Sequence, residues 1–269
     1  MPKHLNQRWV VINPEREYQS ALQLQLSLPT GRLSAFVQGI WSSSVPVESG
    51  ETVKRSLYSD AGSGIVFNLH GEICIGEDVI PKGVIMLPVE KHAEEIALPP
   101  GSRLAGIRFF PAVGYGILGK HYDKPTPLAE QNDLYHLHAL FAQLEQLSTA
   151  QQHIDALYQW ATDNLSITDL IPDALEKTLE GIAQDEELAD LMGNAELSQR
   201  QIERQFKQWL GMTPKYYQRI ARIKKAINYM KAYPEADLVD VAFRFGFSDQ
   251  AHMTREFRTI ACITPGKIS

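Results

Sequence analysis

Cysteine is scarce in this chain of 269 residues, and long apolar runs are absent from it. Its two cysteines, Cys74 and Cys262, lie far apart and in no spacing typical of metal ligands. We therefore expect neither a disulfide framework nor a zinc site. No apolar run reaches the roughly 18 residues of a membrane-spanning helix, and the N-terminal segment lacks the apolar region of a signal peptide. These absences predict a cytoplasmic protein with no membrane partner.

Sequence motifs of catalysis are missing as well. The chain has no nucleophile elbow, phosphate-binding loop or glycine-rich dinucleotide fingerprint. His70, His92 and His121 raise the alternative of a metal-dependent enzyme of the cupin type, but none belongs to a His-x-His motif on predicted neighbouring strands. His136 and His138 do form such a pair, within a predicted helix, where side chains two residues apart point in different directions. We expect no catalytic residues, no metal, no cofactor and no enzymatic activity.

Charge is distributed unevenly along the chain. The net charge is −6, yet residues 197–269 hold 13 Lys and Arg against 6 Asp and Glu, a net charge of +7. The remainder therefore carries −13. Such asymmetry is typical of a nucleic-acid-facing segment joined to a segment with another role. Charge alone fits a solvated basic face equally well.

The N-terminal residues 1–125 have the pattern of a β-rich domain. Ala21–Leu28 alternates apolar and polar residues, as a half-buried strand does, and short apolar runs follow at 64–70, 83–87 and 103–110. Turn signals such as Ser59-Asp60-Ala61-Gly62 separate them. Many short strands with this punctuation predict a barrel or sandwich, and a small barrel can hold one ligand.

Helical periodicity replaces this pattern after Pro127. Leucines at every third or fourth position predict a helix over Leu128–Leu147, and the pattern continues over Ile154–Trp160 and over Asp169–Ile182. The leucine stripe serves either packing within the chain or dimerisation, so a homodimer remains an open alternative. We divide the chain into a β-rich regulatory domain (1–125), a helical linker (126–165) and a C-terminal domain (166–269).

An internal repeat gives the clearest signal in the sequence. Ser198–Lys207 aligns with Asp249–Arg258 at a spacing of 51 residues, and Arg204 then matches Arg255. The first residues of the two segments, a serine and an aspartate, are both good N-cap residues, whose side chains accept from free backbone N–H groups at a helix start. Each segment therefore opens a helix, which we call a reading helix.

Each reading helix is preceded by a short helix and a glycine, the arrangement of a helix-turn-helix unit. In the second unit, Asp237–Phe245 is the short helix and Gly246 ends it in the left-handed conformation. In the first unit, Glu187–Met192 is followed by Gly193, but two extra residues stand before the cap, so the pose of this reading helix is less defined. In such units the second helix lies in the major groove of DNA.

A long amphipathic helix over Lys215–Tyr233 is predicted to join the units at a fixed separation. Its basic residues off the apolar stripe are expected to meet phosphates, which supply affinity without sequence information. These residues are Arg219, Arg222, Lys224 and Lys225.

The outward faces of the reading helices carry side chains suited to base edges, because Arg pairs with guanine and Gln with adenine. They are Gln199, Arg200, Gln201, Glu203 and Arg204 in the first helix and Gln250, His252, Thr254 and Arg255 in the second. The Glu203 carboxylate either accepts a hydrogen bond from the amino group of cytosine or orients a neighbouring arginine.

The tandem resembles the DNA-binding domain of the AraC/XylS family of transcription regulators over about Leu188–Pro265. Asp240–Arg258 follows the family pattern most closely, and Gly211–Pro214 matches the exit of the first unit. The resemblance implies base contacts from Arg200, Glu203, Arg204, Gln250, Ala251, His252, Thr254 and Arg255. Two departures are Cys262 at the position of Gly211, and the end of the chain at Ser269 without the Tyr-Arg that often follows the final proline.

The N-terminal part resembles more loosely the β-barrel sensor domains that precede such modules. Tyr58–Leu69 and Gly106–Tyr115 carry this likeness, which implies an effector-sensing or dimerising role with no defined ligand. The candidate lining of a ligand pocket is Trp41, Tyr58, His70 and Arg108, with Phe67 and Phe109 expected in the core.

The sequence thus predicts an α+β protein, with a cupin-like β-barrel and following helices before an all-α tandem helix-turn-helix domain. We expect a DNA-binding transcription regulator whose partner is double-stranded DNA, with a small-molecule effector of unknown identity and RNA polymerase as further candidate partners. Alternatively, the N-terminal domain serves only dimerisation or control by a protein partner. A third alternative is a cupin-type enzyme fused to a DNA-binding module.

Overall fold

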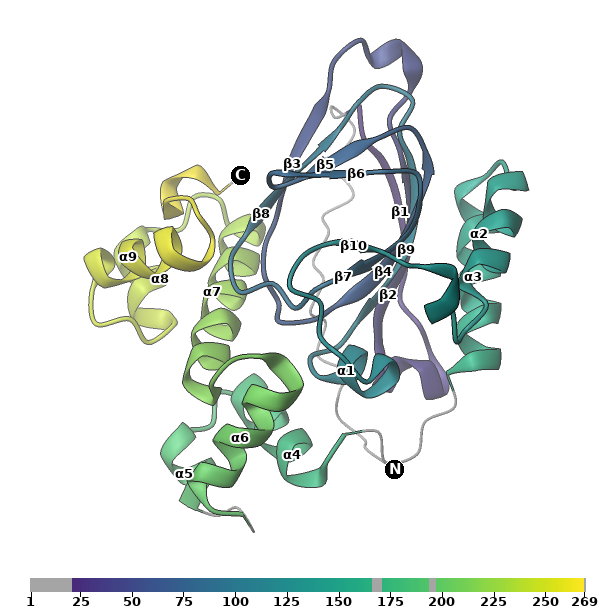
Figure 1. The fold of residues 1–269 in the computed structure, drawn as a ribbon. Coiled ribbons are helices and arrows are strands. Elements are labelled where there is room, and N and C mark those ends of the chain that lie inside the picture. Colours follow the sequence, from purple (N-terminus) through teal and green to yellow (C-terminus); the bar gives the residue numbers. More distant parts are fainter. Residues whose placement is uncertain (1–20, 166–170, 194–196, 269) are drawn as a thin grey trace.

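The computed structural model describes residues 21–165, 171–193 and 197–268. Two antiparallel sheets form the N-terminal part, and helices alone form the C-terminal part (Figure 1). This is the predicted α+β architecture. Among the described residues, no helix combines the length and the apolar character needed to cross a membrane.

Within the described residues, the larger sheet has the strand order β1-β2-β9-β4-β7-β10 and the smaller sheet the order β3-β8-β5-β6. The predicted runs 64–70 and 83–87 form β4 and β7 with the expected bounds. The strands are β1 (Gln23–Ser27), β2 (Val37–Ser44), β3 (Val53–Leu57), β4 (Gly64–His70), β5 (Ile73–Ile75), β6 (Asp78–Ile80), β7 (Gly83–Leu87), β8 (Glu94–Leu98), β9 (Arg103–Phe109) and β10 (Thr126–Pro127).

The larger sheet is buried on both faces. Along β4, Val66 packs with Ile85 in the core shared with the smaller sheet, whereas Ile65 and Phe67 pack on the opposite face. This alternation follows from the two-residue period of a strand. Phe67 and Phe109 are fully buried, as core residues are expected to be.

Helices α2 (Leu137–Gln146) and α3 (Ala150–Asn164) cover the outer face of the larger sheet (Figure 1). The leucine stripe is buried there at Leu137, Leu140 and Leu144, so it packs within the chain. Dimerisation and the proposed domain boundaries stay predictions.

The helix predicted over Leu128–Leu147 starts nine residues later than expected. His136 takes the left-handed conformation, with φ of 54°, and the Asp133 carboxylate accepts from the N–H groups of Leu137 (2.6 Å) and His138 (2.9 Å). Asp133 therefore caps the first turn of α2 from outside the helix, and Leu134 is left exposed. The leucine period alone gave no sign of this local capping.

A separate core holds the C-terminal helices together and includes Phe206, Ile223 and Phe257. A short helix, α1 (Val113–Leu118), precedes α2 in the N-terminal part and faces the C-terminal helices (Figure 1). The C-terminal helices are α4 (Asp173–Ala183), α5 (Leu188–Gly193), α6 (Gln199–Leu210), α7 (Pro214–Ala232), α8 (Leu238–Arg244) and α9 (Gln250–Ile260).

Candidate nucleic-acid interface

Helices α6 and α9 are the two predicted reading helices, and they repeat each other in burial. Ile202 matches Met253 and Phe206 matches Phe257, and all four side chains are fully buried. Because their spacing puts them on one helical face, the remaining residues face outward. The inward faces predicted from the sequence are confirmed.

The second unit has the predicted geometry. Gly246 is left-handed, with φ of 69°, and it separates α8 from α9. Asp249 caps α9 by accepting from the N–H of His252 at 2.6 Å, and Asp237 caps α8 by accepting from the N–H of Val239 at 2.7 Å. Both helix starts are thus fixed by side chains that satisfy free backbone donors.

The first unit begins with α5 and continues with α6. The extra residues of its turn, 194–196, lie outside the described residues. Gln201 closes the start of α6, because its carboxamide oxygen accepts from the N–H of Ser198 at 2.9 Å. This bond holds Gln201 against its own helix, although we predicted the side chain as a base contact.

The residues predicted to contact bases differ in solvent exposure. Exposed side chains predominate: they are Gln199, Arg200, Gln201, Glu203 and Arg204 on α6 and Gln250, Ala251 and Arg255 on α9. His252 and Thr254 are half-buried. Glu203 accepts from the Gln199 amide at 2.9 Å, and Nδ1 of His252 accepts from the N–H of Ser248 at 3.2 Å. Base contact by these residues stays a prediction.

The basic residues of α7 are not arranged as expected. Arg219 donates two hydrogen bonds to Glu256 of α9, at 2.7 and 2.9 Å, and Lys225 pairs with Asp185. Lys224 is buried against the N-terminal domain, with 13% of its side chain exposed. The prediction that Lys224 meets DNA phosphates is therefore wrong for this arrangement, since the face of α7 that carries it is covered by protein.

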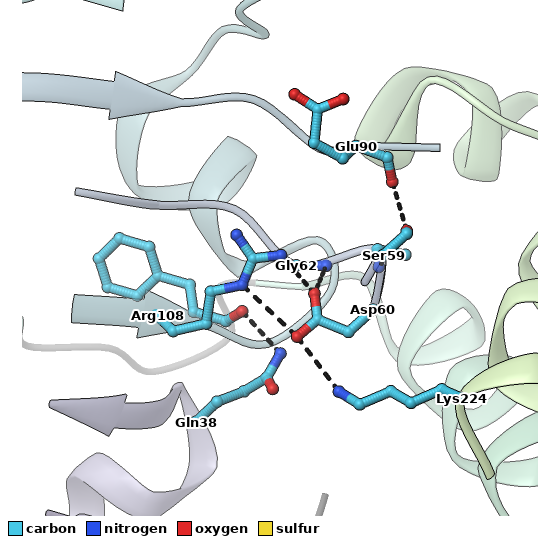
Figure 2. Close-up of polar contacts among 9 residues, drawn as sticks. Gln38, Ser59, Asp60, Gly62, Glu90, Arg108 and Lys224 are labelled. Carbon is cyan, nitrogen blue, oxygen red and sulfur yellow. Dashed lines mark hydrogen bonds and ion pairs between the residues drawn. The ribbon is translucent and has the colours of Figure 1, made fainter. Parts of the chain in front are cut away.

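A buried charge cluster holds α7 to the N-terminal domain. Asp60 lies in the turn between β3 and β4, and its carboxylate bonds Arg108 of β9, Lys224 at 3.2 Å and the N–H of Gly62 at 2.8 Å (Figure 2). Burial alone favours the neutral acid, but the charges of Arg108 and Lys224 hold the pKa of Asp60 well below its usual range. A carboxylate between two cations joins the two parts of the chain.

Two histidines of the N-terminal domain contact the C-terminal ends of the reading helices. His121 Nε2 donates to the carbonyl of Gln208 in α6 at 2.6 Å, and His92 Nδ1 donates to the carbonyl of Thr259 in α9 at 2.7 Å. Carbonyls in the last turn of a helix lack partners within the helix. The two histidines supply these partners from outside the reading helices.

Further contacts surround these two points. The N–H of Ala93 donates to the carbonyl of Ile260 at 2.7 Å, and the Tyr115 ring packs against Trp209 with centroids 5.1 Å apart. All of these contacts fall in the last turns of α6 and α9. The N-terminal turns, where base-reading side chains stand in helix-turn-helix units, are left free by them.

The four predicted ligand residues contact different partners. Trp41 packs against Gly106 of β9, and His70 is exposed at the end of β4. Tyr58 lies under the Lys231 ammonium at 5.4 Å, and burial raises the pKa of its hydroxyl. Arg108 pairs with Asp60. Their role in binding an effector stays a prediction.

Sequence reasoning missed the residues that join the two domains, namely Asp60, His92, His121 and Lys224. In the sequence, Asp60 belongs to a turn signal, and the histidines suggest only candidate metal ligands. No sequence pattern pairs residues this far apart. Within the described residues, no group of three or more His, Cys, Asp or Glu side chains is placed to hold a metal ion.

Comparison with known proteins agrees with this geometry for the C-terminal part. Residues 191–269 match a family model described as a helix-turn-helix domain. The transcriptional activator RhaS of Escherichia coli is 42% identical over 62 residues, which are 23% of this chain and 22% of RhaS. Residues 191–269 form a helix-turn-helix domain. The alignment spans about a fifth of the length of RhaS, so the likeness concerns this domain alone.

Solved structures that align with most of the chain have low sequence identity and low TM-scores. ToxT from Vibrio cholerae has a TM-score of 0.44 and 13% identity, with 81% of this chain and 96% of ToxT covered. The structure of ToxT bound to an unsaturated fatty acid has a TM-score of 0.40 and 14% identity, with 80% of this chain and 92% of ToxT covered. The AraC-like transcriptional activator CuxR has a TM-score of 0.23 and 9% identity, with 88% of this chain and 80% of CuxR covered.

Proposed function

We propose that this chain is a sequence-specific DNA-binding transcription regulator whose helices α6 and α9 enter successive major grooves. One observation carries the proposal: two capped reading helices repeat the same burial pattern at a spacing of 51 residues and expose Arg204 and Arg255 at matching positions. The continuous helix α7 joins them. Successive grooves on one face of DNA lie about 34 Å apart, so a rigid connection favours simultaneous binding.

Selection of bound sequences from random duplex DNA by the full chain tests this proposal. We expect a site with two conserved segments about one helical turn apart. Arg204→Ala should relax preference in one segment and Arg255→Ala in the other. Enrichment of a single segment, or of none, would contradict reading by both helices.

We further propose that the N-terminal domain controls the reading helices through its contacts with them. The charge cluster at Asp60 and the histidine bonds at both helix ends support this role. A small-molecule effector is one means of control, and a protein partner or a second copy of the chain is the alternative. Native mass spectrometry of the purified chain distinguishes them by a bound small mass or a doubled mass. Contact with RNA polymerase stays a prediction.

A further inference from the structure

An ion pair links the second reading helix to α7. Arg219 of α7 donates from Nε and Nη2 to the two carboxylate oxygens of Glu256 in α9, at 2.7 and 2.9 Å. Both side chains are largely covered by protein, with 30% of Arg219 and 15% of Glu256 exposed. A guanidinium that meets a carboxylate with two parallel bonds adds geometric specificity as well as energy. The pair therefore restricts how α9 can rotate against α7.

The buried face of α9 supplies contact with the domain but little directional constraint. Met253, Phe257 and Ile260 are fully buried in the core of the C-terminal helices. Apolar burial has no preferred direction, whereas a bidentate ion pair does. Glu256 directly follows Arg255, the exposed side chain predicted to read a base. Since successive residues lie about 100° apart around a helix, an anchor at Glu256 also sets the direction of Arg255.

Neighbouring side chains hold the Arg219 end of the pair. The Arg219 guanidinium lies over the Tyr216 ring, 5.0 Å from its centroid, as in a cation–π contact. The Tyr216 ring meets His92 of the N-terminal domain edge-on, with centroids 6.2 Å apart. The guanidinium thus has an aromatic ring and a carboxylate as protein partners. This environment suits a structural anchor better than a contact to a DNA phosphate.

The first reading helix differs at the equivalent position. The residue that matches Glu256 at a spacing of 51 residues is Gln205 of α6. Its oxygen Oε1 is buried and accepts from no donor among the described residues. A neutral amide also cannot offer the two ionised oxygens of a charge-assisted pair. The ion pair therefore distinguishes α9 from α6, although the two helices share their buried face.

We propose that Arg219 and Glu256 are positioning residues for base reading, whose ion pair fixes the rotation of α9 so that Arg255 meets its base pair. The inference rests on the proposed function, because it requires that α9 reads bases. Electrostatics alone gives a different expectation. If Arg219 served a phosphate, Glu256 would only compete for it, and loss of the Glu256 charge would strengthen binding to all sequences alike.

Binding of the full chain to its selected DNA site tests the proposal. The selected duplex is compared with one whose α9 segment is scrambled and one whose α6 segment is scrambled. Arg255→Ala and Arg204→Ala assign the segments. In Glu256→Gln, we expect the preference for the selected duplex over the α9-scrambled duplex to fall about tenfold, a change of about 1.4 kcal/mol. The preference over the α6-scrambled duplex should stay unchanged. A ratio of affinities removes any general effect of charge on DNA binding.

Further variants separate geometry from charge. Arg219→Lys keeps the positive charge but loses the rigid fork, so the α9 preference should fall here too. In an Arg255→Ala background, Glu256→Gln should cause little further loss of preference, because residues that act through one interaction are not additive. Glu235→Gln, at an exposed position between α7 and α8, is the matched control. It removes the same charge and should leave both preferences unchanged.

An unchanged α9 preference in Glu256→Gln would overturn the proposal. So would an equal fall in both preferences, which is the result expected from a general loss of structure. If Glu256→Gln fails to fold, Arg219→Lys decides alone. A wild-type chain that selects no two-segment site would reject the proposed function and this inference together. A wild-type chain that selects both segments, with no change in the variants, would reject this inference alone.

Discussion

The carbonyl oxygens of Gln208 and Thr259 occupy equivalent positions in the two reading helices, 51 residues apart, and each accepts a hydrogen bond from a histidine of the N-terminal domain. His121 binds the first and His92 the second. The β-rich domain therefore contacts both reading helices at the same place in their structure. A displacement of the β-rich domain would therefore change its contacts with both reading helices at once.

The first prediction concerns these two bonds. The double variant His92→Ala/His121→Ala should loosen docking, because each lost hydrogen bond costs about 0.5–1.5 kcal/mol. Amide hydrogen exchange should rise in the last turns of α6 and α9 and stay unchanged in the β-sheets. His70→Ala, at an exposed site away from these ends, is the control. Unchanged exchange in the double variant would show that the histidines do not hold the helices.

The second prediction is the cost of removing Asp60. Asp60→Asn leaves Lys224 and Arg108 buried without their carboxylate, and breaking a buried pair in this way costs about 3–5 kcal/mol. Chemical denaturation of the full chain measures the loss. Asp123→Asn, at an exposed position, should leave the free energy of unfolding nearly unchanged. A loss below about 1 kcal/mol in Asp60→Asn would mean that the cluster adds little.

The third prediction is the pH dependence of the same cluster. Because the pKa of Asp60 is lowered by folding, its stabilisation is complete above its unfolded pKa of about 3.9 and is lost as the pH falls through the lower folded value. The difference in unfolding free energy between the wild type and Asp60→Asn should therefore be constant from pH 7 to about 5 and shrink below about 4. A difference that grows towards acid pH has the wrong sign for this mechanism.

The fourth prediction concerns base reading by α9. Arg255→Ala should weaken binding to the cognate site by about 1–3 kcal/mol and relax preference at one base pair. Electrophoretic mobility shifts against every substitution in the site measure both effects. Arg55→Ala, on β3 of the N-terminal domain, is the matched control. If Arg255→Ala weakened binding to all sequences equally, Arg255 would contact a phosphate instead of a base.

The fifth prediction concerns the helix end after α9. Cys262 is left-handed, with φ of 56°, at the position where the first unit has Gly211, with φ of 68°. The left-handed conformation costs a residue with a side chain about 1–2 kcal/mol. Glycine avoids this cost but loses more conformational entropy on folding. Cys262→Gly should stabilise the chain by up to about 1 kcal/mol in chemical denaturation. Gly211→Cys should destabilise it, and a loss of stability in Cys262→Gly would be contrary to this account.

The sequence predicted the elements that depend on neighbouring residues. The N-caps at Ser198 and Asp249, the left-handed Gly246 and the buried faces of α6 and α9 all follow from local chemistry and helical period. Strands β4 and β7 follow from short apolar runs with turns at both ends. These features need no knowledge of what lies across the molecule.

The contacts between domains could not be predicted in this way. Lys224 lies off the apolar stripe of α7, as the helical period predicts, but the β-rich domain covers that face. Its partner Asp60 is 164 residues away in the chain. Long-range ion pairs of this kind depend on the tertiary arrangement, which residue periodicity does not contain.

The ion pairs along α7 change how the charge of the C-terminal domain acts on DNA. Arg219, Lys224 and Lys225 are each paired with an acidic side chain, so their charges are already balanced within the protein. Counterions released from DNA are set by the cations that reach phosphates. The exposed arginines of α6 and α9 would therefore dominate that release. The salt sensitivity of binding should be weaker than the 13 basic residues of 197–269 suggest.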